Sequence, residues 1–342
     1  MKSKLFLVAL MAITIGSFVA PYSASAKRDR SKKSQRAESE VVFSYNIPSV
    51  KIYSAAVTDT TRLFVVSDTH LWVSDSREEP YRSYSKRMAA AYNKTTHYAT
   101  GAPTTPEKEF RATIALAKKQ KADAIVLLGD MVSYPSEQGV EIVQEVMNSA
   151  NIPWYYTCGN HDWHYEGMEG DRLTLRKTWR DKRLLPLFLG KNPDGYVVDV
   201  NGVQLLILDT STYDVLPEQL ALTKRLIASG KPFILLMHIP LYAPGRRVSY
   251  GIGNPNWGAD GDTGYKIERR ERWPAEGHTP IDYEFYEAVT SAPNLLASFS
   301  GHVHTNGVDI IKGKPHFTVE ANARGGYYEV LILPLPEPSK NK

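Results

Sequence analysis

Residues 159–162, with the sequence Gly-Asn-His-Asp, place an amide, an imidazole and a carboxylate side by side. They follow an apolar run at residues 152–158, which predicts a strand that ends in a loop. Asn160 can join harder ligands around an oxygen-loving divalent ion, and His161 beside it is suited to proton transfer. A block of this kind on its own is more often a polar turn. Its meaning therefore depends on whether other strands end in the same way.

Further apolar runs, at residues 63–66, 124–128, 233–237 and 295–299, also predict strands. Each is followed within a few residues by side chains that bind metals: Asp68, His70, Asp130, His238, His302 and His304. Five of the nine histidines lie near a predicted strand end, and none lies inside a predicted helix. Because functional groups gather where the carboxyl ends of strands meet in an α/β sheet, we expect these side chains to cluster.

The types of these side chains indicate the chemistry. Carboxylates and imidazoles without a thiolate suit Mn²⁺, Fe or Zn²⁺ and argue against a structural zinc site. With Asn160 the candidate ligands number seven, too many for one ion, so two divalent ions that share a bridging carboxylate are the simplest interpretation. Two ions about 3.5–4 Å apart can clamp the attacking and leaving oxygens of an in-line displacement at phosphorus.

At these positions the sequence resembles the calcineurin-like metallophosphoesterase superfamily, whose pattern is D-x-H, G-D, G-N-H-D/E, H and G-H-x-H. The blocks occur here in the same order, as Asp68-Thr69-His70, Gly129-Asp130, Gly159-Asn160-His161-Asp162, His238 and Gly301-His302-Val303-His304. The match spans about residues 63–333. The resemblance implies an α/β fold, a four-layer sandwich of two mixed β-sheets flanked by helices.

The resemblance also implies a role for each matched residue. The first metal would be held by Asp68, His70 and His304, and the second by Asn160, His238 and His302, with Asp130 bridging the two. His161 would contact the phosphate and protonate the leaving oxygen, and Asp162 would orient its ring. The nucleophile would be a metal-bridging hydroxide. His70 is present and Tyr134 stands four residues after Asp130 rather than three, which argues against the purple acid phosphatase branch.

The remaining pattern describes the elements that must position this cluster. Helical spacing predicts helices at residues 107–119, 137–148, 172–185, 217–229 and 282–288. Asn201-Gly202 predicts a hairpin between residues 196–200 and 204–208, and Gly313 another between 308–311 and 316–320. A final strand is expected at 327–333, and residues 41–61 favour an edge strand or linker. With no internal repeat, one domain at 41–335 is expected, with a frayed tail at 336–342.

Long segments at residues 71–106 and 242–280 interrupt this pattern and are expected to build a substrate pocket or lid. Residues that could grip a phosphate or stack on a base or sugar are His164, Arg246, Arg247, Tyr250, Trp257, Tyr265 and Trp273. His97 and Tyr98 are similar candidates in the first segment. His278 and His316 are expected to be structural, and the single cysteine, Cys158, to be a small buried side chain.

The N-terminus predicts export. Lys2 and Lys4 precede an apolar stretch, and Ala24-Ser25-Ala26 supplies a cleavage site, so residues 1–26 read as a signal peptide rather than a membrane anchor. A mature protein without stable membrane insertion, periplasmic or secreted, is expected. Residues 27–40 form a basic tail, predicted to be disordered, and residues 37–342 carry about −3 of the whole-chain charge of +4.

The slightly acidic body would repel a long polyanion, so no nucleic-acid partner is expected and a small phosphodiester or phosphomonoester is the favoured substrate. Two alternatives remain. One is a nuclease of the same superfamily, which a basic groove built by the two long segments would favour. The other is a catalytically silent module that binds a phosphate ligand, although no ligand position and no catalytic histidine is missing.

Overall fold

The computed structural model describes residues 41–91, 94–246, 251–255 and 277–336. Two mixed six-stranded sheets form its centre. The first sheet has the order β1 (Val41–Asn46), β2 (Ser49–Ser54), β14 (Tyr328–Pro334), β3 (Thr61–Val66), β6 (Ala124–Leu127) and β7 (Trp154–Tyr156). The second has the order β12 (Gly307–Ile311), β13 (Lys314–Thr318), β11 (Leu295–Ser300), β10 (Phe233–Met237), β9 (Val203–Leu208) and β8 (Gly195–Val200).

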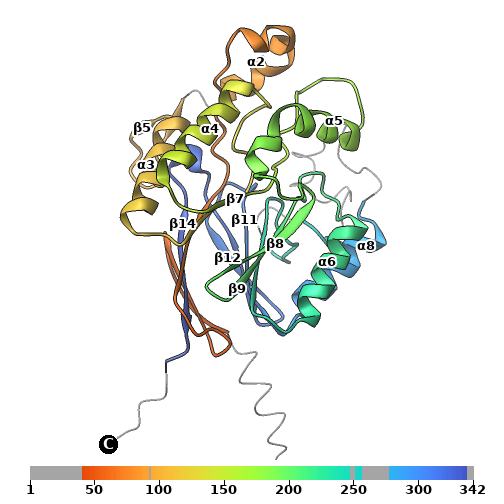
Figure 1. Ribbon diagram of the computed structural model, residues 1–342. Coiled ribbons are helices and arrows are strands. Elements are labelled where there is room, and N and C mark those ends of the chain that lie inside the picture. The colour runs from red at the N-terminus through yellow and green to blue at the C-terminus, as the bar shows by residue number, and fades with distance from the viewer. Residues whose placement is uncertain (1–40, 92–93, 247–250, 256–276, 337–342) are drawn as a thin grey trace, which may run out of the picture.

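Helices flank both sheets (Figure 1). Beside the first sheet lie α3 (Pro106–Lys119) and α4 (Glu137–Ala150), and beside the second lie α6 (Pro217–Ala228) and α8 (Pro280–Thr290). Helix α3 begins where the sequence predicts it, because Thr105 caps the backbone N–H of Lys108 and Pro106 needs no hydrogen-bond partner at the first position. The predicted sandwich of two mixed sheets flanked by helices is confirmed.

The two sheets are joined by an aromatic core. Phe317 of β13 stacks on Phe299 of β11, with ring centroids 4.9 Å apart, and also meets Phe43 of β1 at 5.8 Å. The hydroxyl groups of Tyr45 and Tyr328 lie 2.9 Å apart beside them. Strands β3, β6, β9, β10 and β11 are buried almost throughout, as their continuous apolar sequences require. This core holds the two sheets in place relative to each other, and it therefore also fixes the positions of their strand ends.

Some boundaries differ from the predicted ones. The helix expected at residues 172–185 is α5 (Arg172–Trp179) followed by a π-turn, η2 (Arg180–Leu184), and a 3₁₀ turn, η3 (Leu185–Phe188). Pro186 explains the break, since it has no N–H to continue an α-helical ladder. Of the two alternatives for residues 41–61, the edge strand is confirmed: β1 lies at the edge of the first sheet and forms a hairpin with β2 at residues 41–54.

The first long segment contains regular structure: η1 (Ser76–Tyr81), α2 (Arg82–Ala91) and a small hairpin of β4 (Thr95–Thr96) and β5 (Pro103–Thr104). The second long segment is described only at 242–246, 251–255 and 277–280. Within the described ranges, no helix combines the length and the apolar character that a membrane crossing requires.

Candidate metal centre

Parallel pairing brings the predicted strand ends to one edge. Strand β6 pairs in parallel with β3 and β7, and β10 pairs in parallel with β11, so within each sheet the loops after these strands leave in the same direction. The two sets of loops meet, because His302 N–H donates to Asp68 Oδ2 at 2.9 Å and His238 Nδ1 lies 2.7 Å from Leu128 O. The loops after β3 and β6 are also bonded together, because Asp68 N–H donates to Gly129 O at 3.0 Å and His70 N–H to Asp130 O at 2.8 Å. The ligand-bearing loops are therefore connected by the backbone itself.

Close approach between loops explains two glycines of the motifs. A Cβ at Gly129 would lie 2.2 Å from Gly159 N, and one at Gly159 would lie 2.1 Å from Asp130 Oδ1. Neither contact is sterically allowed. Five of the predicted ligands themselves adopt positive φ angles between 49° and 69°: Asp68, His70, Asp130, His302 and His304. Each such residue costs roughly 1–3 kcal/mol and persists only where the surrounding structure imposes it, as functional sites often do.

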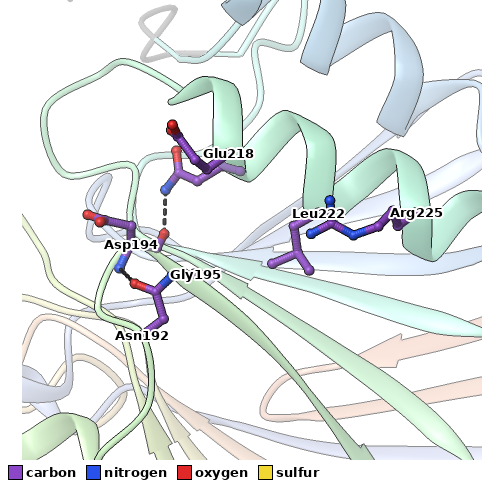
Figure 2. Close-up of a pocket in the computed structure, with 7 residues that line it drawn as sticks. Asn192, Asp194, Gly195, Glu218, Leu222 and Arg225 are labelled. Atoms are coloured by element: carbon purple, nitrogen blue, oxygen red, sulfur yellow. Dashed lines mark hydrogen bonds between the residues drawn. The ribbon is translucent and has the colours of Figure 1, made fainter.

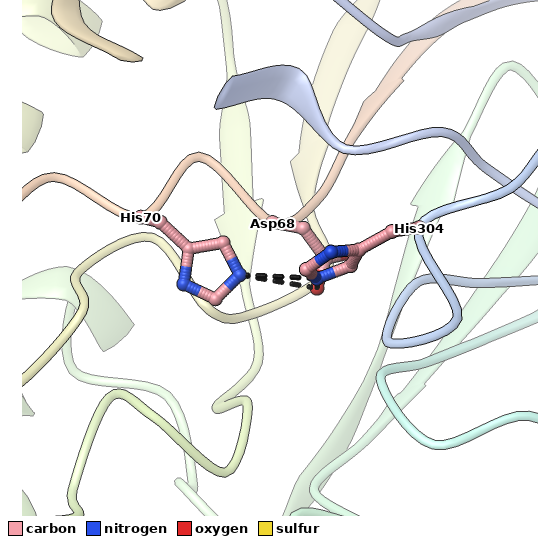
Figure 3. A group of neighbouring side chains, drawn as sticks. All are labelled: Asp68, His70 and His304. Carbon is pink, nitrogen blue, oxygen red and sulfur yellow. Dashed lines mark hydrogen bonds and ion pairs between the residues drawn. The ribbon is translucent and has the colours of Figure 1, made fainter. Parts of the chain in front are cut away.

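Asp68, His70 and His304 form the first ligand group (Figure 3). His304 Nε2 lies 3.0 Å from Asp68 Oδ1 and 3.1 Å from His70 Nε2. His70 Nε2 is 3.8 Å from the same Asp68 oxygen. Two nitrogens and one carboxylate oxygen, carried by the loops after β3 and β11, thus converge on one point.

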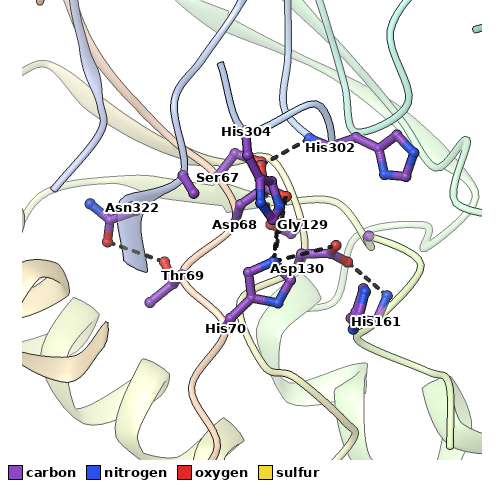
Figure 4. A network of polar contacts seen from close by, with 12 residues as sticks. Ser67, Asp68, Thr69, His70, Gly129, Asp130, His161, His302, His304 and Asn322 are labelled. Carbon is purple, nitrogen blue, oxygen red and sulfur yellow. Dashed lines mark hydrogen bonds and ion pairs between the residues drawn. The ribbon is translucent and has the colours of Figure 1, made fainter. Parts of the chain in front are cut away.

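Asp130, His238 and His302 form the second ligand group, with Asn160 beside them. His238 Nε2 lies 3.2 Å from Asp130 Oδ2 and 3.1 Å from Asn160 Oδ1. The same Asp130 oxygen is 3.9 Å from His70 Nε2, so this carboxylate lies between the two groups. Figure 4 shows Asp130 between His70 and the loop of His161. All seven ligand candidates named from the sequence are therefore brought together.

This donor set fits divalent metal ions. Imidazole nitrogens, carboxylate oxygens and an amide oxygen suit Mn²⁺, Fe or Zn²⁺, and the one cysteine, Cys158, is not part of either group. The approach of two imidazole nitrogens, His70 Nε2 and His304 Nε2, to 3.1 Å next to a buried carboxylate is the arrangement a shared cation stabilises. The two ligand groups therefore fit the divalent metal ions that the sequence predicts.

Electrostatics favour the metal-binding form of three of the ligands, Asp68, Asp130 and His70. Burial by itself would raise the pKa of Asp68 and Asp130, but the surrounding histidines outweigh it and hold both pKa values below their usual range. Burial, aided by the neighbouring His161, lowers the pKa of His70 well below its usual value. Asp68 and Asp130 are therefore carboxylates and His70 is a neutral imidazole near pH 7. Burial by itself would lower the pKa of His238 and His304, but the Asp68 and Asp130 carboxylates outweigh it, raising the pKa of His238 to about 9 and also raising that of His304. A metal ion must therefore displace a proton from these two imidazoles.

His161 lies at the margin of the first ligand group and is partly exposed. Its ring centroid is 4.9 Å from that of His70, at right angles to it. The backbone N–H of His161 donates to Asp130 Oδ1 at 2.7 Å, and its Nδ1 is 3.3 Å from the carbonyl oxygen of Ser133. A ring nitrogen of His161 also lies within 4.8 Å of ligand atoms of His70 and Asp130, a grouping that could itself hold an ion. The proton-transfer role of His161 stays a prediction.

The role predicted for Asp162 needs correction. The Asp162 carboxylate accepts hydrogen bonds from three backbone N–H groups and from the Tyr156 hydroxyl, at 2.8–3.0 Å. None of these four donors is the ring of His161. The three N–H groups belong to Asp130, Val132 and Gly159. Asp162 thus ties the loops after β6 and β7 together beneath the ligands. Burial and the nearby Asp130 charge raise the pKa of Asp162 to about 7.

The predicted substrate-binding residues are placed less favourably. Arg246 is anchored away from the ligands, since its guanidinium binds Asp309 of β12 at 2.6 Å and the Leu241 carbonyl at 2.9 Å. His164 is buried, with an exposed fraction of 2%. Arg247 and Trp257 lie outside the described residues, as do Tyr250, Tyr265 and Trp273. The guanidinium of Arg246 is therefore paired with Asp309, and its contact with a phosphate stays a prediction.

The remaining histidines have packing partners. His97 packs against Gly325, and the next residue, Tyr98, donates its N–H to Arg324 O at 2.9 Å, so the β4–β5 hairpin is docked on η4 (Asn322–Arg324). His278 Nε2 lies 2.8 Å from Gly251 O. His316 is buried and hydrogen-bonded to Ser298 at 2.7 Å. These contacts agree with the structural roles expected for His278 and His316.

Two residues near the ligands were not predicted. Asn322 is fully buried and holds the loop after β3: its N–H donates to Ser67 O at 2.8 Å and its Oδ1 accepts from the Thr69 hydroxyl at 3.2 Å (Figure 4). Tyr213 is also fully buried, and its hydroxyl lies 2.5 Å from His302 Nε2. Tyr213 comes shortly after strand β9, and this position after a strand end could have identified it as a site residue from the sequence. Asn322 is marked by no comparable pattern.

A small cavity of about 140 Å³ lies elsewhere, between the start of β8 and α6 (Figure 2). Its described lining includes Asp194, Glu218 and Arg225. As far as the described residues show, the predicted site residues do not line it, so it is separate from the metal centre.

The comparisons with known proteins decide the family. The calcineurin-like phosphoesterase profile matches residues 61–306, a range that contains all five blocks of the ligand pattern. The chain belongs to this family. This membership and the clustered ligands support a hydrolase that acts on phosphoester bonds. No curated protein matches the chain.

Solved structures that are similar to the chain were found at low sequence identity. A dimetal phosphatase from Danio rerio is 11% identical over 77% of this chain and 88% of its own, with a TM-score of 0.48. A putative 5'-nucleotidase from Staphylococcus aureus is 12% identical over 83% of this chain and 56% of its own, with a TM-score of 0.42. A phosphopantetheinyl hydrolase from Mycobacterium tuberculosis is 12% identical over 82% of this chain and 98% of its own, with a TM-score of 0.37.

Proposed function

We propose that this chain is an exported, dinuclear metal-dependent phosphoesterase that hydrolyses a small phosphodiester or phosphomonoester. The observation that carries the proposal is the position of Asp130 between two ligand groups, each of which offers several nitrogen and oxygen donors. When bound, two divalent ions supply an activated water nucleophile and neutralise the charge that develops at phosphorus.

The chain's own residues perform the remaining tasks. Asp68 and Asp130 supply the buried negative charge that attracts the ions, and the backbone bonds between their loops hold the two carboxylates in register. His161, partly exposed and held by the Asp130 carboxylate and the Ser133 carbonyl, donates a proton to the leaving oxygen. Asp162 fixes the two loops that carry Asp130 and His161.

The substrate and setting follow from charge and from the N-terminus. Residues 37–342 carry about −3, which disfavours a nucleic-acid substrate, so a small ester without a nucleic-acid partner is proposed. The signal-peptide pattern at residues 1–26 supports a periplasmic or secreted protein after cleavage near Ala26.

The test uses the chain from Lys27 onward, loaded with Mn²⁺, on an aryl phosphodiester and on the matching monoester, each with and without a chelator. Chelator-sensitive release of the aryl alcohol from either substrate is expected. Preference for the diester or for the monoester would assign the enzyme as a phosphodiesterase or a phosphatase. Hydrolysis of neither ester by protein that holds two metals would contradict the proposal and favour a module that only binds its ligand.

A further inference from the structure

The loop after β9 lies against the second ligand group although it contains none of the motif residues. Tyr213 in this loop has a φ of +65°, unusual for a bulky residue, and its side chain is fully buried. Its N–H donates to the carbonyl of Thr210 at 2.9 Å, which closes a tight turn. A side chain held in a costly backbone conformation and withdrawn from water needs a compensating contact.

The turn is bonded to the loops that carry other site residues. The Thr210 hydroxyl accepts the N–H of Ile239, the residue after His238, at 3.2 Å. The Ser211 hydroxyl accepts the indole N–H of Trp163, which follows the Gly-Asn-His-Asp block, at 2.9 Å. The position of Tyr213 is thus defined by the loops after β7 and β10.

The phenol of Tyr213 contacts His302 directly. Its hydroxyl is 2.5 Å from His302 Nε2, and the two rings meet edge to face with centroids 5.4 Å apart and an interplanar angle of 80°. His238, the other imidazole of this group, is held in an equivalent way, since its Nδ1 lies 2.7 Å from the Leu128 carbonyl and its Nε2 faces Asp130. Both imidazoles of the second ligand group therefore have a protein partner on one ring nitrogen.

We propose that Tyr213 is a positioning residue for the second metal site, fixing the orientation and tautomer of His302 so that this histidine coordinates through Nδ1. A neutral imidazole carries one N–H, and a partner that accepts the Nε2 proton leaves the Nδ1 lone pair for a metal. Partners of this kind orient metal-binding histidines, and their loss typically costs about 10–100-fold in metal affinity. The inference rests on the proposed dinuclear site but concerns metal binding rather than turnover.

The test measures Mn²⁺ binding by chelator-stripped protein, followed by calorimetry or by the EPR signal of free Mn²⁺. Tyr213→Phe, which removes only the hydroxyl, is expected to weaken one of two Mn²⁺ sites by about 10–100-fold and to leave the other unchanged. Tyr328→Phe is the matched control, because Tyr328 is equally buried but bonds to Tyr45 and the Thr318 carbonyl in the core between the sheets. This control is expected to leave both affinities unchanged.

A double-mutant cycle identifies the route of the effect. In a His302→Ala background, the further change Tyr213→Phe is expected to have no additional effect on Mn²⁺ affinity, because the residue it positions is absent. A second loss of affinity in that background would show that Tyr213 acts on the metal directly or through the fold, and would overturn the inference. A thermal melt in chelator confirms that each variant is folded.

The outcome separates this inference from the proposed function. A wild-type protein with two Mn²⁺ sites and a Tyr213→Phe variant with the same two affinities would overturn the inference alone. A wild-type protein that binds no Mn²⁺ would overturn the proposed function as well.

Discussion

The two ligand groups differ in how they meet solvent. In the first group the His304 side chain is 31% exposed, and the partly exposed His161 lies against His70 of the same group. In the second group the His238 side chain is fully buried, and both imidazoles have partners, the Leu128 carbonyl and the Tyr213 hydroxyl. The second group is therefore the more buried of the two, and we expect a substrate to reach the centre from the side of the first.

This difference assigns different tasks to similar residues. A buried, fully bonded ligand resists rearrangement, so it holds a metal while the chemistry changes around it. A partly exposed ligand beside a proton donor can accommodate an incoming phosphate and its leaving group. Asp130 is common to both groups, so variants of Asp130 should affect both sides, while variants of other residues should affect one.

The largest effect is expected for Asp130→Asn, which keeps the shape of the side chain but removes its charge. At least one metal should be lost, and with it several kcal/mol of transition-state stabilisation, about a thousandfold or more in turnover. Metal content by plasma mass spectrometry and the rate of ester hydrolysis measure the two effects. Retention of two metals per chain would end the bridging role of Asp130.

His161→Ala should act on the open side alone. Metal content is expected to stay near that of the wild type, while turnover falls by about 10²–10⁴-fold, the usual contribution of general acid–base catalysis. His316→Gln is the control, since His316 is a buried histidine that bonds to Ser298 and belongs to neither ligand group. Loss of metal from the His161 variant would make His161 a ligand and contradict its assignment as proton donor.

Asn322→Ala should weaken the first ligand group and spare the second. The change removes side-chain bonds to Thr69, Thr113 and the Gly326 carbonyl, all buried, at a cost of about 1–3 kcal/mol in stability. Because Thr69 lies between Asp68 and His70, Mn²⁺ affinity should fall at one site only. Asn322→Ala and Tyr213→Phe should therefore lower Mn²⁺ affinity at different sites. An equal loss of Mn²⁺ affinity at both sites in the Asn322→Ala variant would show that Asn322 does not support the first site alone.

The smallest effect concerns a group outside both sites. Burial lowers the pKa of His316 from 6.5 to about 3 in the folded state, so the unfolded chain binds the proton first as the pH falls. The associated stability is present above pH 6.5 and is lost as the pH falls towards 3. Between about pH 7.5 and 6, the free energy of unfolding of the His316→Gln variant should therefore fall by about 1 kcal/mol less than that of the wild type. Urea denaturation at each pH measures this free energy. An identical pH profile in both proteins would show that the His316 pKa is not lowered.

The sequence predicted the parts that depend on local patterns. Continuous apolar runs define the buried strands, and the ligands follow them within a few positions, so His238 and Asp130 could be assigned without knowledge of the fold. Contacts between distant segments could not be predicted in this way. Tyr213 meets a residue 89 positions away, and Asn322 one 253 positions away. Neither separation leaves a periodic signal in the chain.

Two specific predictions depended on neighbours that only the fold supplies. Arg246 was one candidate for gripping a phosphate, and the fold brings Asp309 of β12 to its guanidinium, a neighbour that the sequence does not reveal. The family resemblance implied that Asp162 orients the ring of His161. The turn after β7 instead points its carboxylate to backbone N–H groups of two loops. Adjacency in a tight turn does not determine which atoms side chains reach.

Anomalous diffraction from crystals of the Mn²⁺-loaded protein would test the central claim most directly. The account predicts two manganese peaks about 3.5–4 Å apart, one among Asp68, His70 and His304, the other among Asn160, His238 and His302, with the Asp130 carboxylate between them. A single peak, or two peaks that do not share Asp130, would contradict the dinuclear centre proposed for this chain.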